Sequence, residues 1–155
     1  MKPFITPEAL DVGSKVIRFQ CEGIVPENIW EGLRGLSIVA YEMPLEHSLR
    51  AAWIFRLIFD DCSIFEFSSA CTMVVDWQEV GSLNIRLIHN SSDVPHHKVT
   101  GFVRVDIQQF SVGSLEKLVY QDDDVTSECG LVFCGVDDQE IVVAAGISPG
   151  SVSIA

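Results

Sequence analysis

The clearest structural signal in the chain is the segment Leu57–Ser69, which reads LIFDDCSIFEFSS. An apolar run ends at Phe59, two aspartates follow, and the run that starts at Ser63 alternates between apolar and polar side chains. Aspartate favours turns because its carboxylate accepts a hydrogen bond from the backbone further along. Alternation with a period of two is typical of a strand with one buried face. The segment therefore predicts a β hairpin in which Asp60 and Asp61 have a structural role in the turn.

The same pattern returns at Leu131–Ala145, which reads LVFCGVDDQEIVVAA. From Leu36 on, the chain consists of short runs rich in Val, Ile and Phe, separated by polar or Gly-containing turns. Turn signals recur roughly every 8 to 12 residues, a spacing typical of antiparallel hairpins and meanders. No segment after residue 50 has the length and helical pattern needed to connect parallel strands. We expect strands at Leu36–Glu42, Ala52–Phe59, Ser63–Ser69, Thr72–Trp77, Asn84–His89, Val99–Ile107, Leu115–Tyr120, Gly130–Cys134, Glu140–Ala145 and Ser151–Ile154.

The predicted fold is mainly β (α+β), with antiparallel sheets packed as a sandwich or curled into a half-barrel, and one or two short N-terminal helices. The helix signals lie in residues 1–35, where Thr6–Leu10 places a cap residue before a proline and Pro26–Gly35 can form two turns that end at glycine. The length favours a single domain over residues 1–155, with a short helical segment at 1–35 and a β-rich core at 36–155.

Net charge limits the choice of partner. The 155 residues include 22 Asp and Glu against 10 Lys and Arg, so the formal net charge is −12 and the pI is near 4.5. Nucleic acid is therefore excluded as a partner, because phosphate binding depends on Lys and Arg. Apolar residues make up 48% of the chain, which is enough for a folded core. The charge favours a basic protein partner, unless it serves solubility alone.

The negative charge is concentrated near the C-terminus. Residues 1–120 contain 15 acids and 10 bases, a net of −5, whereas residues 121–155 contain seven acids and no base, a net of −7. Two acidic clusters stand out, Asp122–Asp124 and Asp137–Asp138. If the strand between them is Gly130–Cys134, the clusters lie about 15 to 20 Å apart at its two ends. The alternative is that these acids only solvate loops. The candidate residues for partner contact are Asp122, Asp123, Asp124, Asp137, Asp138 and Glu140.

Motifs that would support catalysis or cofactor binding are incomplete. The serine in Gly146–Gly150 lacks the spacing and the following helix of a nucleophile elbow. The segment Gly32–Gly35 lacks the Lys-Ser/Thr of a phosphate-binding loop. A zinc site needs a second closely spaced ligand pair, and none accompanies the candidate ligands His47, His89, His96, His97, Cys129 and Cys134. We therefore expect a protein without enzymatic activity, metal or cofactor.

The N-terminus and the cysteines indicate a compartment. The first residues, MKPFITPE, have no apolar core of a signal peptide. The most apolar stretch, Ala51–Phe59, is far shorter than the roughly 20 residues that span a bilayer. The chain has five cysteines, an odd number with irregular spacing. We expect a cytoplasmic protein with reduced thiols and no membrane segment.

The three tryptophans have different expected roles. Trp53 lies in the most apolar run and is expected in the core. Trp77 precedes a turn, where an exposed ring can anchor an interface. Trp30 lies on the predicted helix at 26–35 and fits either role.

The C-terminal hairpin also carries a resemblance to a known family. Residues Glu128–Phe133, the acidic turn, and Glu140–Ile154 resemble the closing hairpin and final strand of small acidic bacterial immunity proteins. These are the cognate antitoxins of polymorphic or contact-dependent growth-inhibition toxins. The resemblance implies an acidic, β-rich, non-enzymatic inhibitor that binds a toxin domain, often a nuclease with a basic surface. It transfers no individual functional residue.

Three function classes follow from the sequence. The leading hypothesis is a non-enzymatic protein-binding inhibitor of the immunity type, which neutralises a basic toxin domain through its acidic surface. The alternative is a small-molecule-binding β barrel, or an uncharacterised enzyme, that uses an apolar interior. The third is a structural subunit that oligomerises through an exposed strand edge. A filled core with an acidic face favours the first class, whereas an apolar cavity with converging polar groups favours the second.

Overall fold

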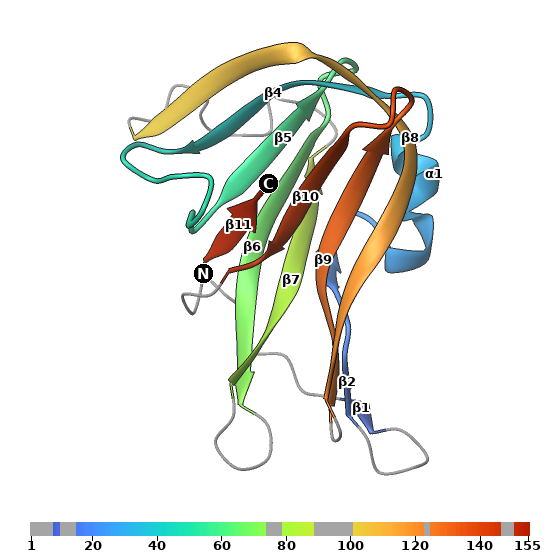
Figure 1. Cartoon of the computed structure of the whole chain (residues 1–155), viewed down its shortest axis with the longest axis vertical. Helices are drawn as coiled ribbons and strands as arrows, with labels where there is room; N and C mark the ends of the chain where they lie inside the picture. Colours follow the sequence, from blue (N-terminus) through green and yellow to red (C-terminus); the bar gives the residue numbers. More distant parts are fainter. Residues whose placement is uncertain (1–7, 10–14, 74–78, 89–100, 123–124, 147–150) are drawn as a thin grey trace.

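A computed structural model describes residues 8–9, 15–73, 79–88, 101–122, 125–146 and 151–155 of the chain (Figure 1). The fold is mainly β with one short α helix, α1 (Ile29–Leu33), which follows a 3₁₀ turn, η1 (Pro26–Asn28). The strands are β1 (Glu8–Ala9), β2 (Lys15–Ile17), β3 (Gln20–Glu22), β4 (Ser37–Pro44), β5 (Phe55–Phe59), β6 (Ile64–Met73), β7 (Glu79–Ile88), β8 (Phe102–Asp122), β9 (Val125–Gly135), β10 (Glu140–Ala145) and β11 (Val152–Ile154).

The helix expected at Pro26–Gly35 is confirmed. Pro26 starts the 3₁₀ turn, where its missing N–H costs no hydrogen bond. Ile29 and Leu33, four residues apart on one face of α1, are buried, so packing holds a helix too short to be stable alone. Gly35 adopts a φ of 81°, a left-handed conformation that ends the helix at little steric cost.

The prediction of a second helix at Thr6–Leu10 is wrong for the two residues of this range that the structure describes, Glu8 and Ala9. Glu8 and Ala9 form strand β1, which pairs antiparallel with Val16 and Lys15 on β2. A helix of one turn gains few hydrogen bonds, whereas a short strand beside an existing sheet gains main-chain pairing immediately. The segment before residue 36 therefore supplies three strands as well as α1.

The strands form one open sheet with the order β1-β2-β9-β8-β4-β5-β6-β7-β3, and β10 joins it between β9 and β11. Most neighbours are antiparallel, as expected, and the hairpins β5–β6 and β9–β10 are both confirmed. Among the described strands, two pairs are parallel, namely β2 with β9 and β3 with β7. Both include a strand from the segment that the sequence predicts as helical.

Strand β8 explains how the sheet curls. The sequence predicts two strands here, Val99–Ile107 and Leu115–Tyr120, but β8 is a single strand of 21 residues. Its first half pairs with β4 and its second half with β9, with register shifts near the change of partner. Figure 1 shows β8 as a long arc over the top of the molecule. Because one strand belongs to both halves of the sheet, the halves fold over each other and enclose the core.

The core between the two halves is aromatic. Five phenylalanines with at most 1% exposure fill it, namely Phe55, Phe59, Phe65, Phe67 and Phe133. The rings of Phe67 on β6 and Phe133 on β9 meet edge to face, with centroids 6.1 Å apart. Ser127 Oγ on β9 donates a hydrogen bond of 2.6 Å to the carbonyl oxygen of Gly81 on β7. The expected mainly β fold is therefore confirmed, in the form of a large open sheet, mostly antiparallel, whose two halves share β8.

Trp53 does not belong to this core, contrary to expectation. Its side chain is 70% exposed, whereas Ala52 and Phe55 on either side are buried. Strand β5 begins at Phe55 and not at residue 52, so Trp53 lies in the loop between β4 and β5. Its backbone N–H donates to His47 Nδ1 at 3.3 Å, and the Trp53 and His47 rings meet edge to face.

No helix in the described part of the chain is long and apolar enough to cross a membrane.

Candidate functional site

The turn between β5 and β6 is built by its two aspartates, as the sequence predicts. Asp60 Oδ1 accepts a hydrogen bond from the backbone N–H of Ser37 at 3.1 Å, and the backbone N–H of Asp60 donates to the Ser37 carbonyl at 2.9 Å. Asp61 Oδ1 accepts from both the N–H and the hydroxyl of Ser63, at 2.9 and 2.6 Å. Both aspartates remain exposed, so their charge faces solvent from a fixed backbone.

The turn between β9 and β10 has the same character. Asp137 Oδ1 accepts from the backbone N–H of Gln139 at 3.4 Å, and Asp138 adopts a φ of 67°. Aspartate tolerates this left-handed conformation better than most residues. Asp137, Asp138 and Glu140 are exposed, and Val136 between them and the sheet is 74% exposed. The turn thus presents three carboxylates around an apolar side chain.

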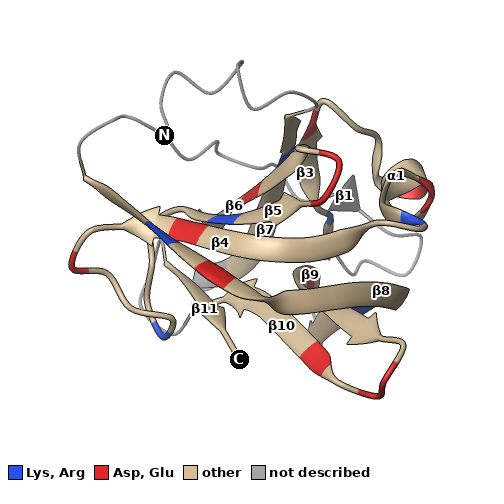
Figure 2. Cartoon of the chain, turned by 90° about the horizontal axis from the view of Figure 1, so that it is seen from above, with Lys and Arg blue, Asp and Glu red and all other residues tan. Residues whose placement is uncertain are grey.

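These two turns lie at the same end of the molecule, one on each side of β4 and β8 (Figure 2). Ser37 on β4 and Ser111 on β8 are joined through their hydroxyl oxygens at 3.1 Å. Ser37 also bonds Asp60, and the Ser111 carbonyl accepts the backbone N–H of Val136 at 3.1 Å. We call this surface, defined by Asp60, Asp61, Val136, Asp137, Asp138 and Glu140, the acidic end. The sequence ranges that include the two turns and Ser111, namely 57–85, 105–116 and 118–155, contain no Lys or Arg.

The other expected partner-contact residues do not reach the acidic end. Asp122 ends β8 at the opposite end of β9, and Asp123 and Asp124 lie outside the described residues. Strand β9 has 11 residues, whereas the expected strand Gly130–Cys134 has five. At roughly 3.3 Å per residue its ends are about 35 Å apart, so the expected separation of 15 to 20 Å is wrong. Asp122, at the end of β8 opposite Val125, is therefore separated from the β9–β10 turn by the length of β9.

Glu128 is buried and does not contribute its charge to the surface. It is 7% exposed, its Oε1 accepts the backbone N–H of Phe19 at 2.8 Å, and its Oε2 lies 2.7 Å from Lys117 Nζ. The Lys117 side chain comes from the neighbouring strand β8. Glu128 therefore ties β8, β9 and the segment before β3 together, and has a structural role.

A row of charges crosses the outer face of the sheet. Register places oppositely charged residues directly opposite each other on successive strands. The row, which we call the charge ladder, consists of Arg104 on β8, Glu42 on β4, Arg56 on β5, Glu66 on β6, Arg86 on β7 and Glu22 on β3. Alternating signs across strands stabilise a sheet by about 0.2 to 1 kcal/mol per pair. Sequence reasoning missed the ladder because it depends on register between strands far apart in the chain.

The ladder is tight at its centre and loose toward β3. Arg56 Nε lies 2.8 Å from Glu66 Oε2, both side chains are at most 15% exposed, and the guanidinium stacks on the Phe102 ring with 4.2 Å to its centroid. Arg86 in contrast lies 3.7 Å from Glu66 Oε1 and 3.8 Å from Glu22 Oε2, with its side chain 49% exposed. The exposed end of the ladder therefore retains hydrogen-bonding capacity.

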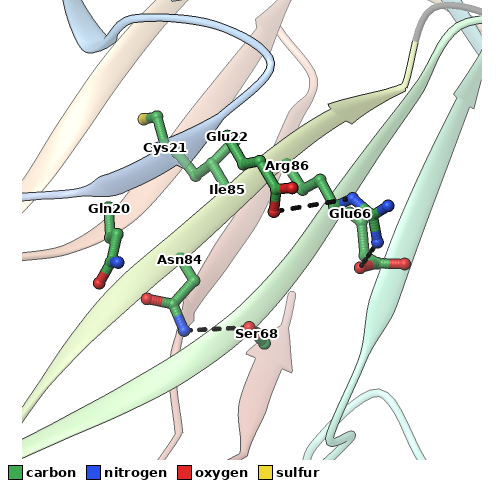
Figure 3. Close-up of a pocket in the computed structure, with 8 residues that line it drawn as sticks. All are labelled: Gln20, Cys21, Glu22, Glu66, Ser68, Asn84, Ile85 and Arg86. Atoms are coloured by element: carbon green, nitrogen blue, oxygen red, sulfur yellow. Dashed lines mark hydrogen bonds and ion pairs between the residues drawn. The ribbon is translucent and has the colours of Figure 1, made fainter. Parts of the chain in front are cut away.

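A groove of about 410 Å³ opens at this exposed end, between β3, β7 and β6 (Figure 3). Gln20, Glu22, Glu66, Ser68, Asn84 and Arg86 supply its polar groups, and Cys21 and Ile85 also line it. Asn84 is 8% exposed; its Nδ2 donates to Ser68 Oγ at 3.1 Å, and its Oδ1 has no hydrogen-bond partner among the residues that the structure describes. An unpaired buried acceptor costs about 1 to 3 kcal/mol. The sequence offered no signal for this groove.

Of the described cysteines, Cys21 alone lines the groove. Burial, with Glu128 and Glu27 nearby, raises the pKa of the Cys21 thiol to about 11. Burial also raises the pKa of Cys129. Cys21, Cys62, Cys129 and Cys134 are free thiols, and no group of three or more His, Cys, Asp and Glu in the described ranges is placed to hold a metal ion. His89, His96 and His97 lie outside those ranges.

No family model, curated protein or solved structure matches the chain.

Proposed function

We propose that the protein is a non-catalytic binding protein that captures a basic protein through its acidic end. The observation that supports this proposal is the meeting of two aspartate turns, from hairpins far apart in the chain, at one end of the sheet. The specific form of the proposal is the inhibitor class to which the sequence resemblance points, with a basic toxin domain as the partner.

The construction of the acidic end suits fast capture. Its turn aspartates accept hydrogen bonds from the backbone, so their charges are held in position before a partner arrives. A fixed surface of one sign steers an oppositely charged partner and raises its association rate, most strongly at low salt. Val136, exposed among the carboxylates, can add an apolar contact once the partner has docked.

The described fold gives less support to the alternative of a ligand inside a closed barrel. The sheet order ends at β1 and β3 without closing, and phenylalanines fill the space between the two halves. The third hypothesis, oligomerisation through a strand edge, stays a prediction that size-exclusion chromatography can test.

Affinity capture from an extract of the source cell tests the proposal with matched variants. The acidic-end variant combines Asp137→Asn, Asp138→Asn and Glu140→Gln. These substitutions remove the charges, keep the side-chain shapes and retain the Oδ1 acceptor at position 137. The control combines Glu46→Gln, Asp106→Asn and Glu116→Gln, three exposed acids outside the acidic end. Both change the net charge from −12 to −9.

The wild type and the control should retain a basic protein that the acidic-end variant loses at near-physiological salt. Retention of the same protein by all three, or of no basic protein by the wild type, would contradict the proposal. Identification of the retained protein as a toxin domain would support the inhibitor class, and a different basic protein would overturn that specific form.

A further inference from the structure

The groove between β3, β7 and β6 is separate from the acidic end, and the function proposed above does not use it. We propose that this groove is a binding site for a small neutral carbohydrate, recognised through its hydroxyl groups. Its volume of about 410 Å³ falls within the usual range for small-molecule sites, roughly 300 to 1,000 Å³.

The first observation that points to a ligand is the unsatisfied amide of Asn84. Its Nδ2 bonds Ser68, and its buried Oδ1 points away from Ser68 into the side of the groove where Gln20 lies (Figure 3). Buried polar groups without partners are rare in native proteins and call for an explanation. Gln20 lies opposite Asn84 in the β3–β7 register and its side chain is exposed and lines the groove, so its amide can contact a ligand that binds beside Asn84. A ligand hydroxyl that donates to Oδ1 supplies the missing partner.

Charge balance in the groove selects a neutral ligand. Glu22, Glu66 and Arg86 line the groove, and Arg56, which lies outside the lining, pairs with Glu66 at 2.8 Å, so the formal charges of the four residues sum to zero. An anion bound at Arg86 would meet Glu66 and Glu22, whose oxygens already lie 3.7 and 3.8 Å from the same guanidinium. An ammonium group bound at those carboxylates would meet Arg86 in turn. Ligands of either sign are therefore disfavoured.

A sugar matches the remaining capacity for hydrogen bonding. The Arg86–carboxylate distances exceed the usual hydrogen-bond range, so the guanidinium keeps N–H groups to donate and both glutamates keep oxygens to accept. Gln20 and Ser68 add groups that both donate and accept. Each hydroxyl of a sugar also donates and accepts, so adjacent hydroxyls can satisfy this mixed lining without adding charge.

Solution NMR of the ¹⁵N-labelled full chain tests this inference. The probes are glucose, galactose, mannose, maltose and lactose, each titrated to about 50 mM, which detects affinities in the millimolar range. Glucuronate and glucosamine serve as charged comparators. At least one neutral sugar should shift the backbone signals of β3 and β7 and the side-chain amide signals of Asn84 and Gln20 in a saturable way. The comparators should bind more weakly.

Two variants locate the binding. Gln20→Ala removes an exposed side chain and should weaken sugar binding about 5-fold, the effect of one lost hydrogen bond. Arg104→Gln, at the far end of the charge ladder, is the matched control and should bind as the wild type does. The inference is overturned if no neutral sugar causes saturable shifts, if the charged comparators bind as well as the sugars, or if Gln20→Ala binds unchanged. None of these results bears on capture of a basic protein at the acidic end.

Discussion

Ser37 and Ser111 place their hydroxyl oxygens 3.1 Å apart on the adjacent strands β4 and β8. The backbone of Ser37 exchanges hydrogen bonds with Asp60, and the carbonyl of Ser111 accepts the N–H of Val136. This single serine contact therefore connects the two acidic turns through a continuous series of hydrogen bonds. The relative position of the two turns is therefore set by the pairing of β4 with β8.

The turn role of Asp61 predicts a loss of stability on truncation. Asp61→Ala removes the acceptor of two hydrogen bonds from Ser63, and should lower the free energy of unfolding by about 1 to 2 kcal/mol. Asp61→Asn keeps the Oδ1 acceptor and should stay within about 0.5 kcal/mol of the wild type. Urea denaturation followed by circular dichroism measures both. Equal stability of the alanine variant and the wild type would show that the turn does not need this side chain.

The buried carboxylate of Glu128 predicts a larger effect. Glu128→Ala leaves the backbone N–H of Phe19 without its acceptor and Lys117 without its ion-pair partner. We expect a loss of about 2 to 3 kcal/mol in the free energy of unfolding. Glu116→Ala, at an exposed position of the neighbouring strand, is the control and should change stability by less than about 0.5 kcal/mol. Similar losses for the two variants would contradict a structural role for Glu128.

The raised pKa of Cys21 predicts slow alkylation. A thiol with a pKa of about 11 in place of 9.0 has about 100-fold less thiolate at pH 8, and only the thiolate reacts. Iodoacetamide should therefore modify Cys21 about 100-fold more slowly in the folded protein than in urea, with site occupancy read by peptide mass spectrometry.

The raised pKa of the Cys21 thiol also makes the stability of the protein depend on pH above 9. Because the folded-state pKa of Cys21 lies above the unfolded value, ionisation favours the unfolded chain, and the Cys21 contribution to stability falls as the pH rises from 9 toward 11. Cys21→Ala should show a smaller loss of stability over this pH window than the wild type does. An identical pH dependence would rule out Cys21 as its source.

The exposure of Trp53 predicts tolerance to its removal. Trp53→Ala should cost less than about 1 kcal/mol, because the side chain is 70% exposed. Phe67→Ala, at a fully buried ring, should cost about 3 to 5 kcal/mol. Thermal and urea denaturation compare the two variants. Comparable losses would mean that Trp53 is part of the core after all.

Local patterns predicted the parts of the fold that local interactions form. The hairpins at 57–69 and 131–145 and the helix at 26–35 are confirmed, because turn aspartates, period-two alternation and a proline-to-glycine spacing act within a few residues. Trp53 was misplaced because an apolar run does not reveal where its strand begins. Strand β8 was divided in two because its polar centre resembles a turn, although it lies where the strand changes partner.

The candidate site was predictable only in part. The charge asymmetry of the sequence predicts Asp137, Asp138 and Glu140 as contact residues; they lie together at the β9–β10 connection, and their contact with a partner stays a prediction. Their proximity to Asp60 and Asp61 depends on the order of strands in the sheet, which no local pattern reveals. The charge ladder and the groove at Asn84 depend on register between β3, β6 and β7. Nonlocal pairing therefore separates the features that were missed from those that were found.

The association rate between the protein and its captured basic partner tests the central claim most directly. The rates of the wild type, the acidic-end variant and the control variant are compared by stopped flow at about 50 mM and about 200 mM salt. The acidic-end variant should associate at least about 10-fold more slowly than the wild type at the lower salt concentration, with the difference reduced at the higher one. The control should remain within about 2-fold of the wild type. Equal slowing of both variants, or no slowing of either, would contradict capture through the acidic end.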